Sequence, residues 1–325
     1  MVDAPLAPPG LEQEDAARRP AVGYALVLAA VLLWSFNGVL AKVVVNAAGL
    51  SALRLAEVRG TGAALLLFGA VALLRPGSLR VSRGEALYLA LFGVCGLAFV
   101  HFFYFVAITH LDIGIALVIQ YLAPVLIALW ARFFVHEPVR RRLWVALALS
   151  LTGLSLVVEL WGGGALDGTG VAASLAAAVA YALYILMADH RLQRGRDAYS
   201  LLAWGFVFAA VFWAIAQPWW SFPTASLTED VSLSGRLEDA QAPIWTLVAY
   251  IVVLGTIVPF LLMVNALRYI PPARATIVAT AEPVLAGLVA WAWLREDLGP
   301  AQIAGGVLVL AGILLAQTAR LGSGT

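Results

Sequence analysis

The chain of 325 residues is 62% hydrophobic and only 12% charged, and its mean hydropathy is +0.93. Soluble domains carry roughly 25% charged residues, so this composition excludes a soluble globular protein and predicts an all-α membrane protein. The net charge of +1 gives no electrostatic indication of a nucleic-acid partner. A transmembrane β-barrel would show alternating segments of about ten residues in place of long apolar runs.

Ten apolar runs follow a polar, proline-rich tail at residues 1–20, which we expect to be disordered. Each run is close to the roughly 20 residues that a helix needs to cross a bilayer. The first run is too long for a signal-peptide core and has no cleavage site after it, so we expect it to be retained. The predicted spans are 21–42, 52–74, 85–107, 112–134, 142–161, 169–188, 199–216, 242–264, 272–294 and 299–318.

The basic residues predict how these spans are oriented. With both termini in the cytoplasm, the inner loops and tails carry fifteen arginines, whereas the outer loops carry only Lys42, Arg236 and Arg295. Cytoplasmic loops of membrane proteins are enriched in Lys and Arg. We therefore expect a multi-pass protein of the inner (plasma) membrane with cytoplasmic tails at 1–20 and 319–325, and with the polar loop 217–241 outside.

Several chemistries lack their sequence signatures. Lys42 is the only lysine and does not stand in a Gly-Lys-Ser/Thr phosphate loop, so the chain has no such ATP site. His136-Glu137 lacks the second histidine of a zinc HExxH motif, and no Gly-x-Ser-x-Gly occurs. The single cysteine, Cys95, allows no disulfide within the chain. We expect no enzymatic activity, no metal and no cofactor.

An internal repeat links the two halves. A shift of 159 residues places Pro124 on Pro283 and Glu137 on Glu296, with twelve identities over 58 positions. Each half holds five spans, and an odd number requires the halves to insert in opposite directions. Inverted repeats are typical of transporters, with the substrate site near mid-bilayer between the halves. The predicted units are repeats at 21–161 and 169–318, joined by a linker at 162–168.

The segments PVLIALWARFFVHE and AEPVLAGLVAWAWLRE, with the repeat ends LSLTGLSLV and LVLAGILLA, resemble the EamA family of the drug/metabolite transporter superfamily. The resemblance covers roughly residues 22 to 318. It implies ten helices around a central cavity lined by spans one to four and six to nine. It also implies transport of small metabolites, often outward, with amino acids among them. Where the family usually has glycine before the later glutamate, this chain has His136 and Arg295.

Glu282 has the deepest predicted position of any acidic residue. If span nine enters the hydrocarbon near Pro272, Glu282 lies ~15 Å inside, close to the midplane. A charge at that depth is expected to be paired or functional, and Pro283 frees a helix carbonyl that protein or a water-lined cavity must satisfy. Glu282 is therefore a candidate for substrate-ammonium binding and proton coupling, with a structural hydrogen-bonding role as the alternative.

Arg59 is the second candidate charge, ~10 Å inside span two. It could bind a substrate carboxylate, or it could form a structural pair with Glu57 or Glu282. Arg54 and Glu57 are separated by three residues and can pair on one face of the helix.

Polar and aromatic residues at matched repeat positions complete the candidate site. A shift of 147 places Trp34 and Asn37 on Tyr181 and Tyr184, and a lining of aromatic and amide groups suits a small ligand. Aromatic packing is the alternative. His101 and Tyr104 are interpreted as interfacial anchors or gate residues. The expected substrate-binding residues are Glu282, Arg59, Trp34, Asn37, Tyr181, Tyr184, Gln120 and Tyr121, and the expected kink or gate prolines are Pro124, Pro283 and Pro259.

These features predict a secondary transporter, expected to export small polar metabolites such as amino acids by alternating access. Export of drugs or other amphipathic compounds is the first alternative, and an intramembrane enzyme or a channel is weaker. The expected partners are a small-molecule substrate, the bilayer and, if Glu282 couples, protons. Exchange and facilitated movement remain open as mechanisms, as do a monomer and a homodimer.

Overall fold

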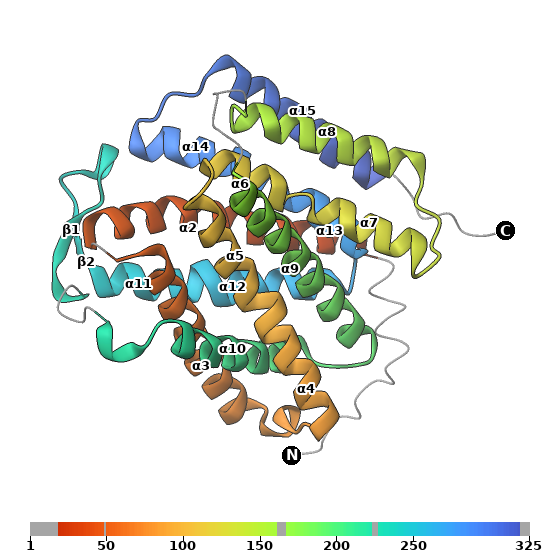
Figure 1. Ribbon diagram of the computed structural model, residues 1–325, viewed down its shortest axis with the longest axis horizontal. Helices are drawn as coiled ribbons and strands as arrows, with labels where there is room; N and C mark the ends of the chain where they lie inside the picture. Colours follow the sequence, from red (N-terminus) through yellow and green to blue (C-terminus); the bar gives the residue numbers. More distant parts are fainter. Residues whose placement is uncertain (1–18, 49, 161–166, 223–226, 319–325) are drawn as a thin grey trace.

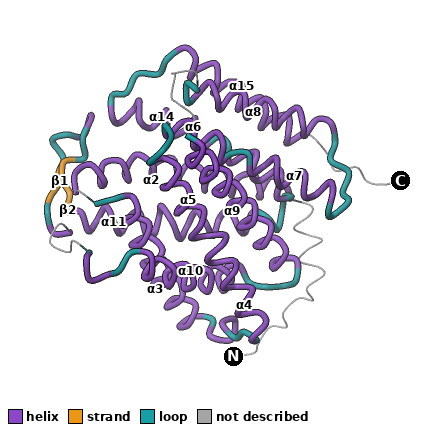
Figure 2. Tube along the Cα trace, viewed as in Figure 1, coloured by secondary structure: helices purple, strands orange, loops and turns teal. Residues whose placement is uncertain are grey.

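The computed structural model describes residues 19–48, 50–160, 167–222 and 227–318. The predicted tails therefore fall almost wholly outside the described residues, as does most of the predicted linker. The described chain is a bundle of helices with one small two-stranded hairpin (Figures 1 and 2). In chain order the first half contains α2 (Pro20–Ala48), α3 (Ala52–Leu74), α4 (Arg83–Leu91), α5 (Phe99–Ile108), α6 (Ile113–Gln120), α7 (Ala123–Phe133) and α8 (Arg141–Val157). The second half contains α9 (Gly168–Gln193), α10 (Ala198–Ala216), α11 (Ile244–Val252), α12 (Val258–Ala266), α13 (Pro272–Ala279), α14 (Glu282–Leu294) and α15 (Pro300–Thr318).

The composition and length of the helices confirm an all-α polytopic membrane protein. Within the described ranges, nine helical stretches are long and apolar enough to cross a bilayer. The stretch predicted at 142–161 is α8, which covers only 17 residues and is not one of the nine. At ~1.5 Å per residue, α8 is about 26 Å long, slightly less than a ~30 Å hydrocarbon core.

Capping side chains set where several helices begin. Ser51 accepts a hydrogen bond from the Arg54 amide at the start of α3, and Ser82 does the same for the Glu85 amide at the start of α4. Asp167 and Asp197 cap α9 and α10 in the same way. Such caps satisfy amides that have no partner inside the helix, so these polar residues begin the spans that follow them.

The packing of α2 and α9 crosses between the halves of the chain. α2 packs against α11, α12, α13 and α14, whereas α9 packs against α5, α6 and α7. α3 lies along α10, and α7 contacts α13. The first helix of each half is therefore surrounded by the third and fourth spans of the other half.

α8 and α15 form a separate pair at one side of the bundle (Figure 1). Their backbones approach closely at glycines. A Cβ at Gly153 would meet the Val309 amide at 2.7 Å, and a Cβ at Gly312 would meet the Ala146 carbonyl at 2.8 Å. Glycine at these positions lets the two helices pack at a distance that any larger residue would prevent.

Two spans are broken at the same repeat position. α6 ends at Gln120 and α7 begins at Ala123, with Pro124 as its second residue. α13 ends at Ala279 and α14 begins at Glu282, again with proline, Pro283, as the second residue. Because proline has no amide to donate, it is tolerated in the first turn of a new helix and interrupts a continuing one.

Two other spans contain π-helical segments. η2 (Phe92–Ala98) lies between α4 and α5, and η6 (Val253–Ile257) lies between α11 and α12. Pro259 follows η6 as the second residue of α12. π-helical turns are rare and often lie at functional sites, and their extra residue leaves backbone carbonyls free for other donors.

The loop between α10 and α11 covers one end of the bundle, here called the hairpin face. β1 (Asp230–Ser232) and β2 (Gln241–Pro243) pair antiparallel, as seen at the left of Figure 1. Trp293 in α14 donates its indole N–H to the Leu233 carbonyl at 3.0 Å. Lys42 Nζ binds Glu296 Oε1 at 2.6 Å, while Arg295 lies 3.5 Å from Glu238. The fold therefore pairs Glu296, just after α14, with α2 rather than with the neighbouring Arg295.

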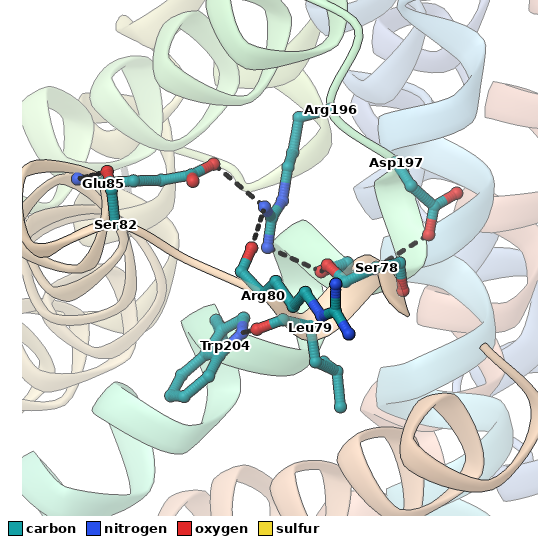
Figure 3. A network of polar contacts seen from close by, with 9 residues as sticks. Ser78, Leu79, Arg80, Ser82, Glu85, Arg196, Asp197 and Trp204 are labelled. Carbon is teal, nitrogen blue, oxygen red and sulfur yellow. Dashed lines mark hydrogen bonds and ion pairs between the residues drawn. The ribbon is translucent and has the colours of Figure 1, made fainter. Parts of the chain in front are cut away.

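A polar network ties the α3–α4 loop to the start of α10 at the other end of the bundle, here called the Arg196 face (Figure 3). Arg196 donates to Glu85 Oε1 at 2.9 Å, to the Arg80 carbonyl at 3.2 Å and to Ser200 Oγ at 2.7 Å. Ser200 Oγ donates to the Ser78 carbonyl at 2.6 Å. The Trp204 indole donates to the Leu79 carbonyl at 3.2 Å. These bonds join a loop of the first half to a helix of the second.

Candidate functional site

The centre of the candidate site is Glu282, the first residue of α14 after the break from α13. The hydroxyl of Tyr121 donates a hydrogen bond of 2.9 Å to Glu282 Oε2. Tyr121 itself lies in the equivalent break between α6 and α7. Tyr121 and Glu282 are 161 residues apart in the chain, and their hydrogen bond joins the two helix breaks.

Two more tyrosines lie within electrostatic range of the Glu282 carboxylate. Tyr104 comes from α5 and Tyr181 from α9. Tyr121 also lies within electrostatic range of both of them. One phenolic hydroxyl thus binds the carboxylate directly, and two more lie within electrostatic range of it. Phenol oxygens can donate to a carboxylate or accept from a cation, so such a cluster can hold either a proton or an ammonium group.

The backbone of Glu282 is fixed from the opposite half of the chain. The hydroxyl of Ser35 in α2 lies 3.0 Å from the Glu282 carbonyl and 2.8 Å from the Val31 carbonyl, so the two carbonyls share its single hydrogen. Ser35 is fully buried. A serine that binds a carbonyl at a helix break stabilises that break by satisfying a group that lipid could not satisfy.

Arg59 in α3 is bound by neutral groups of η6. Its Nε donates to Thr256 Oγ1 at 3.0 Å, and one terminal nitrogen reaches the Gly255 carbonyl at 3.5 Å. In an α-helix the Gly255 carbonyl would accept a hydrogen bond from the amide four residues later. That residue is Pro259, which has no amide hydrogen. The carbonyl is therefore available to the arginine.

The alternative in which Arg59 forms a structural pair with Glu57 or Glu282 is not found: neither ion pair is present in the part of the chain that the structure describes. Glu57 binds Arg54 at 2.7 Å, as the spacing of three residues predicts, and its side chain is fully buried. Glu282 lies within electrostatic range of Arg59 but outside ion-pair distance.

Asn37 packs directly against Gly255, where any Cβ would overlap its side-chain oxygen. Tyr184 packs in the same way against Gly96 in η2, where a Cβ would lie 3.1 Å from the tyrosine Cα. Asn37 matches Tyr184 in the repeat, and Gly255 matches Gly96. Each half thus places a residue of its first span on a π-helical glycine of the other half.

An aromatic cluster around Phe260 contacts this region. Its ring lies 5.4 Å from Trp34, 5.4 Å from Tyr184 and 5.5 Å from Phe206, measured between centroids. Tyr181 stacks on Tyr184 at 6.2 Å. The cluster joins the predicted residues Trp34, Tyr181 and Tyr184 through Phe260, which the sequence did not single out because phenylalanine in an apolar span looks like ordinary packing.

Three candidate side chains have a buried polar atom that finds no hydrogen-bond partner among the described residues. They are the side-chain oxygens of Asn37 and Gln120 and the hydroxyl of Tyr184. Unpartnered polar atoms are costly inside a protein, and they are explained most simply when a ligand or water completes them.

A cavity of about 20 Å³ lies beside Arg59. Glu282, the predicted centre, does not line it. His101, interpreted from the sequence as an anchor or gate residue, lines this cavity together with Trp213. The lining residues are Ala56, Arg59, Gly60, Leu97, His101, Phe206, Ala209, Trp213 and Thr256.

Comparison with known proteins places this arrangement in a family. A model of the EamA-like transporter family matches residues 21–159 and again 168–318. The threonine/homoserine exporter RhtA of Escherichia coli K12 is 28% identical over 274 residues, covering 84% of this chain and 81% of the exporter. An uncharacterized inner membrane transporter, YicL of Salmonella typhimurium, is 26% identical over 295 residues, covering 89% and 93%.

Other similarities agree in fold. An uncharacterized transporter of Archaeoglobus fulgidus is 28% identical over 213 residues, covering 66% of this chain and 70% of the relative. A solved crystal structure matches with a TM-score of 0.73 at 19% identity, covering 91% of this chain and 96% of the other. At that identity the match concerns the fold alone.

Proposed function

Because the chain belongs to the EamA-like transporter family, we propose that it is a secondary transporter that exports small polar metabolites such as amino acids. The protein works by alternating access, in which two inverted five-helix repeats move about a site between them. The 28% identity to a threonine/homoserine exporter supports amino acids as the substrate class.

The observation that carries this proposal is the hydrogen bond from Tyr121 to Glu282. It joins the first family-matched segment, which also supplies Tyr104, to the second, which also supplies Tyr181. A carboxylate at the contact between two halves can change its surroundings when the halves rearrange. Glu282 binds the ammonium group of the substrate in one arrangement and a proton in another, which couples transport to protons by antiport.

Three features support the inverted arrangement. The breaks before Pro124 and Pro283 and the glycines of η2 and η6 recur at one spacing of 159 residues. In the pair Asn37–Gly255 the first half supplies the larger residue and the second half supplies the glycine. In the pair Tyr184–Gly96 these roles are reversed. α8, though short, matches α15 by its place in the repeat and is the tenth membrane helix.

The remaining assignments belong to the same proposal. The repeats are 21–161 and 169–318, the membrane is the inner membrane, and both termini are cytoplasmic with the hairpin face outside. The protein needs no resident cofactor, because Glu282, Arg59 and the aromatic residues Trp34, Tyr181 and Tyr184 supply the binding groups. Asn37, Gln120 and Tyr121 add polar contacts, and the helix ends at Pro124, Pro259 and Pro283 act as hinges.

Export of drugs or other amphipathic cations is a second candidate. The aromatic contacts of Phe260 with Trp34 and Tyr184 favour it, because aromatic faces attract organic cations. Amino acids and amphipathic cations share the ammonium group that Glu282 binds, and they differ in the carboxylate.

Transport by the purified protein in vesicles tests the proposal. Vesicles loaded with a mixed amino-acid extract should lose specific compounds faster than protein-free vesicles, at a rate that depends on pH. Glu282→Gln should abolish this pH dependence and lower the rate at least tenfold. Glu137→Gln, at an exposed position, should transport as the wild type does. Normal rate and pH dependence in Glu282→Gln would contradict the assignment of the site.

A further inference from the structure

The half-buried guanidinium of Arg59 has no counter-ion within ion-pair distance among the described residues. Its hydrogen-bond partners are a hydroxyl and a carbonyl, and neither carries a charge. A charge that is withdrawn from water without a partner of opposite sign is costly, especially in a membrane span. An anion delivered by a ligand would remove this cost.

Donors remain free on Arg59 for such an anion. A guanidinium has five N–H groups in a planar fork, and two are used by Thr256 and Gly255. Three are left, and the arginine lines the cavity of about 20 Å³. Two parallel N–H groups of an arginine match the two oxygens of a carboxylate in geometry and charge.

The size and walls of the cavity limit what can enter. Its remaining walls are Ala56, Gly60, Leu97, His101 and the rings of Phe206 and Trp213, with Ala209 beside them. A volume of about 20 Å³ is close to that needed by a single small molecule such as water. It is therefore too small for an amino-acid side chain, and of a bound substrate only the oxygen end of a carboxylate would enter it.

His101 is a polar residue of this wall. Its Nδ1 lies 3.1 Å from the Leu97 carbonyl, so Nδ1 carries the hydrogen and the Nε2 of the neutral ring is an acceptor, which leaves Arg59 as the donor to a carboxylate. The imidazole is therefore held in one orientation by its own helix. Glu282 lies within electrostatic range of Arg59, but neither it nor Tyr104, Tyr121 and Tyr181 line the cavity.

We propose that the cavity beside Arg59, His101 and Thr256 is a subsite for the carboxylate of the substrate, separate from the Glu282 subsite for its ammonium group. The inference rests on the proposed transport function and narrows its substrate to zwitterions. Arg59 binds the carboxylate, Thr256 positions Arg59, and the side chain of the substrate extends toward the aromatic cluster of Phe260. Amides, esters and simple amines then lack one of the two required charges.

Small probes test the subsite without knowledge of the natural substrate. The melting temperature of the purified full-length protein is measured in rising concentrations of sodium acetate, sodium chloride and acetamide. The two salts share one cation, and acetamide is the neutral counterpart of acetate. A ligand that binds only the folded state raises this temperature in proportion to its occupancy. Acetate should stabilise the wild type, whereas acetamide and chloride should not.

Variants show whether Arg59 and the cavity cause the effect. Arg59→Gln should remove the difference between acetate and acetamide, and Ala56→Val should remove it by filling the cavity while keeping the charge. Arg236→Gln, at an exposed arginine of the hairpin face, should respond as the wild type does. Should Arg59→Gln fail to fold, Ala56→Val gives the same answer. Equal responses to acetate and acetamide in the wild type overturn the subsite, and an equal response to chloride replaces it with a general anion site.

A transport measurement separates this inference from the proposed function. For each amino acid that the vesicles release, the matching amide should compete at least tenfold less well in the wild type and equally well in Arg59→Gln. Transport without any acetate effect would leave the exporter proposal standing and overturn the carboxylate subsite. An acetate effect without transport would contradict the exporter proposal and leave the carboxylate site at Arg59 standing.

Discussion

The hydroxyl of Tyr121 lies 2.9 Å from Glu282 Oε2, and this bond connects the two broken spans of the molecule at their breaks. Both groups belong to short stretches that lie between helix segments, Gln120 to Ala123 and Ala279 to Glu282. The carboxylate is therefore held by a side chain that belongs to the other half of the chain.

Tyr121→Phe should weaken substrate binding without unfolding the protein. The change removes one hydrogen bond to a charged group, worth about 1.5–3 kcal/mol, or roughly a tenfold to hundredfold change in an equilibrium constant. The measurement is the apparent KM for release of an identified amino acid from vesicles. Tyr199→Phe, at an exposed tyrosine, is the matched control. An unchanged KM in Tyr121→Phe would show that the bond is absent when substrate binds.

Gly255→Ala should destabilise the protein because its new methyl group overlaps the side chain of Asn37. Overpacking of this kind costs about 1–3 kcal/mol. Asn37→Ala should make room for it, so the double variant should recover stability that the single glycine variant loses. The free energy of unfolding of the four proteins gives the coupling. Gly69→Ala is the control, because nothing lies within 4 Å of that position, and it should be neutral or slightly stabilising.

The sequence predicted the elements that depend on local patterns. Apolar runs of bilayer length located the spans, and Pro283 after a buried acid located the break at which Glu282 stands. The three-residue spacing of Arg54 and Glu57 predicted their ion pair. Each of these predictions follows from helix geometry or from the missing amide of proline, and none of them depends on distant parts of the chain.

The partners of the candidate residues could not be predicted, because tertiary packing selects them. Arg59 binds Thr256, which is 197 residues away, in place of the nearby Glu57. Glu57 is already paired with Arg54, and the carbonyl of Gly255 is freed by Pro259 in a different span. No single-span pattern contains this information. The π-helical segments escaped prediction for the same reason, since their composition is that of an ordinary apolar helix.

Arg196→Ala should loosen the contact between the α3–α4 loop and α10 (Figure 3). Its side chain is only 13% exposed, and it donates to Glu85, Ser200 and the Arg80 carbonyl. Its removal leaves a partly buried carboxylate with one partner fewer, so we expect a loss of about 2 kcal/mol, at the lower end of the range for broken charge networks. Thermal unfolding measures this loss. Arg194→Ala, at an exposed arginine two residues away, should change stability by less than about 0.5 kcal/mol.

Asp167 should make stability depend on pH in acid. It accepts a hydrogen bond from the Gly170 amide at 2.9 Å, and this bond, with His110 nearby, holds the pKa of Asp167 below its usual value. A lowered pKa in the folded state contributes stability above the unfolded pKa, and the contribution is lost as pH falls through the lowered value. Asp167→Asn keeps a capping oxygen but does not titrate. Its melting temperature should therefore fall less than that of the wild type between pH 5 and pH 3, and an equal fall would contradict the role of this carboxylate.

The hairpin face and the Arg196 face should be accessible from opposite sides of the membrane. Asp239 lies in the exposed hairpin loop and Arg194 in the loop between α9 and α10. After Cys95→Ala removes the only cysteine, Asp239→Cys should react with an impermeant maleimide added to intact cells, because the excess of arginines on the other face predicts that face to be cytoplasmic. Arg194→Cys should react only after the cells are permeabilised. Labelling of Arg194→Cys alone in intact cells would invert the orientation, and labelling of both would show that the two loops share one side and that the inverted arrangement is wrong.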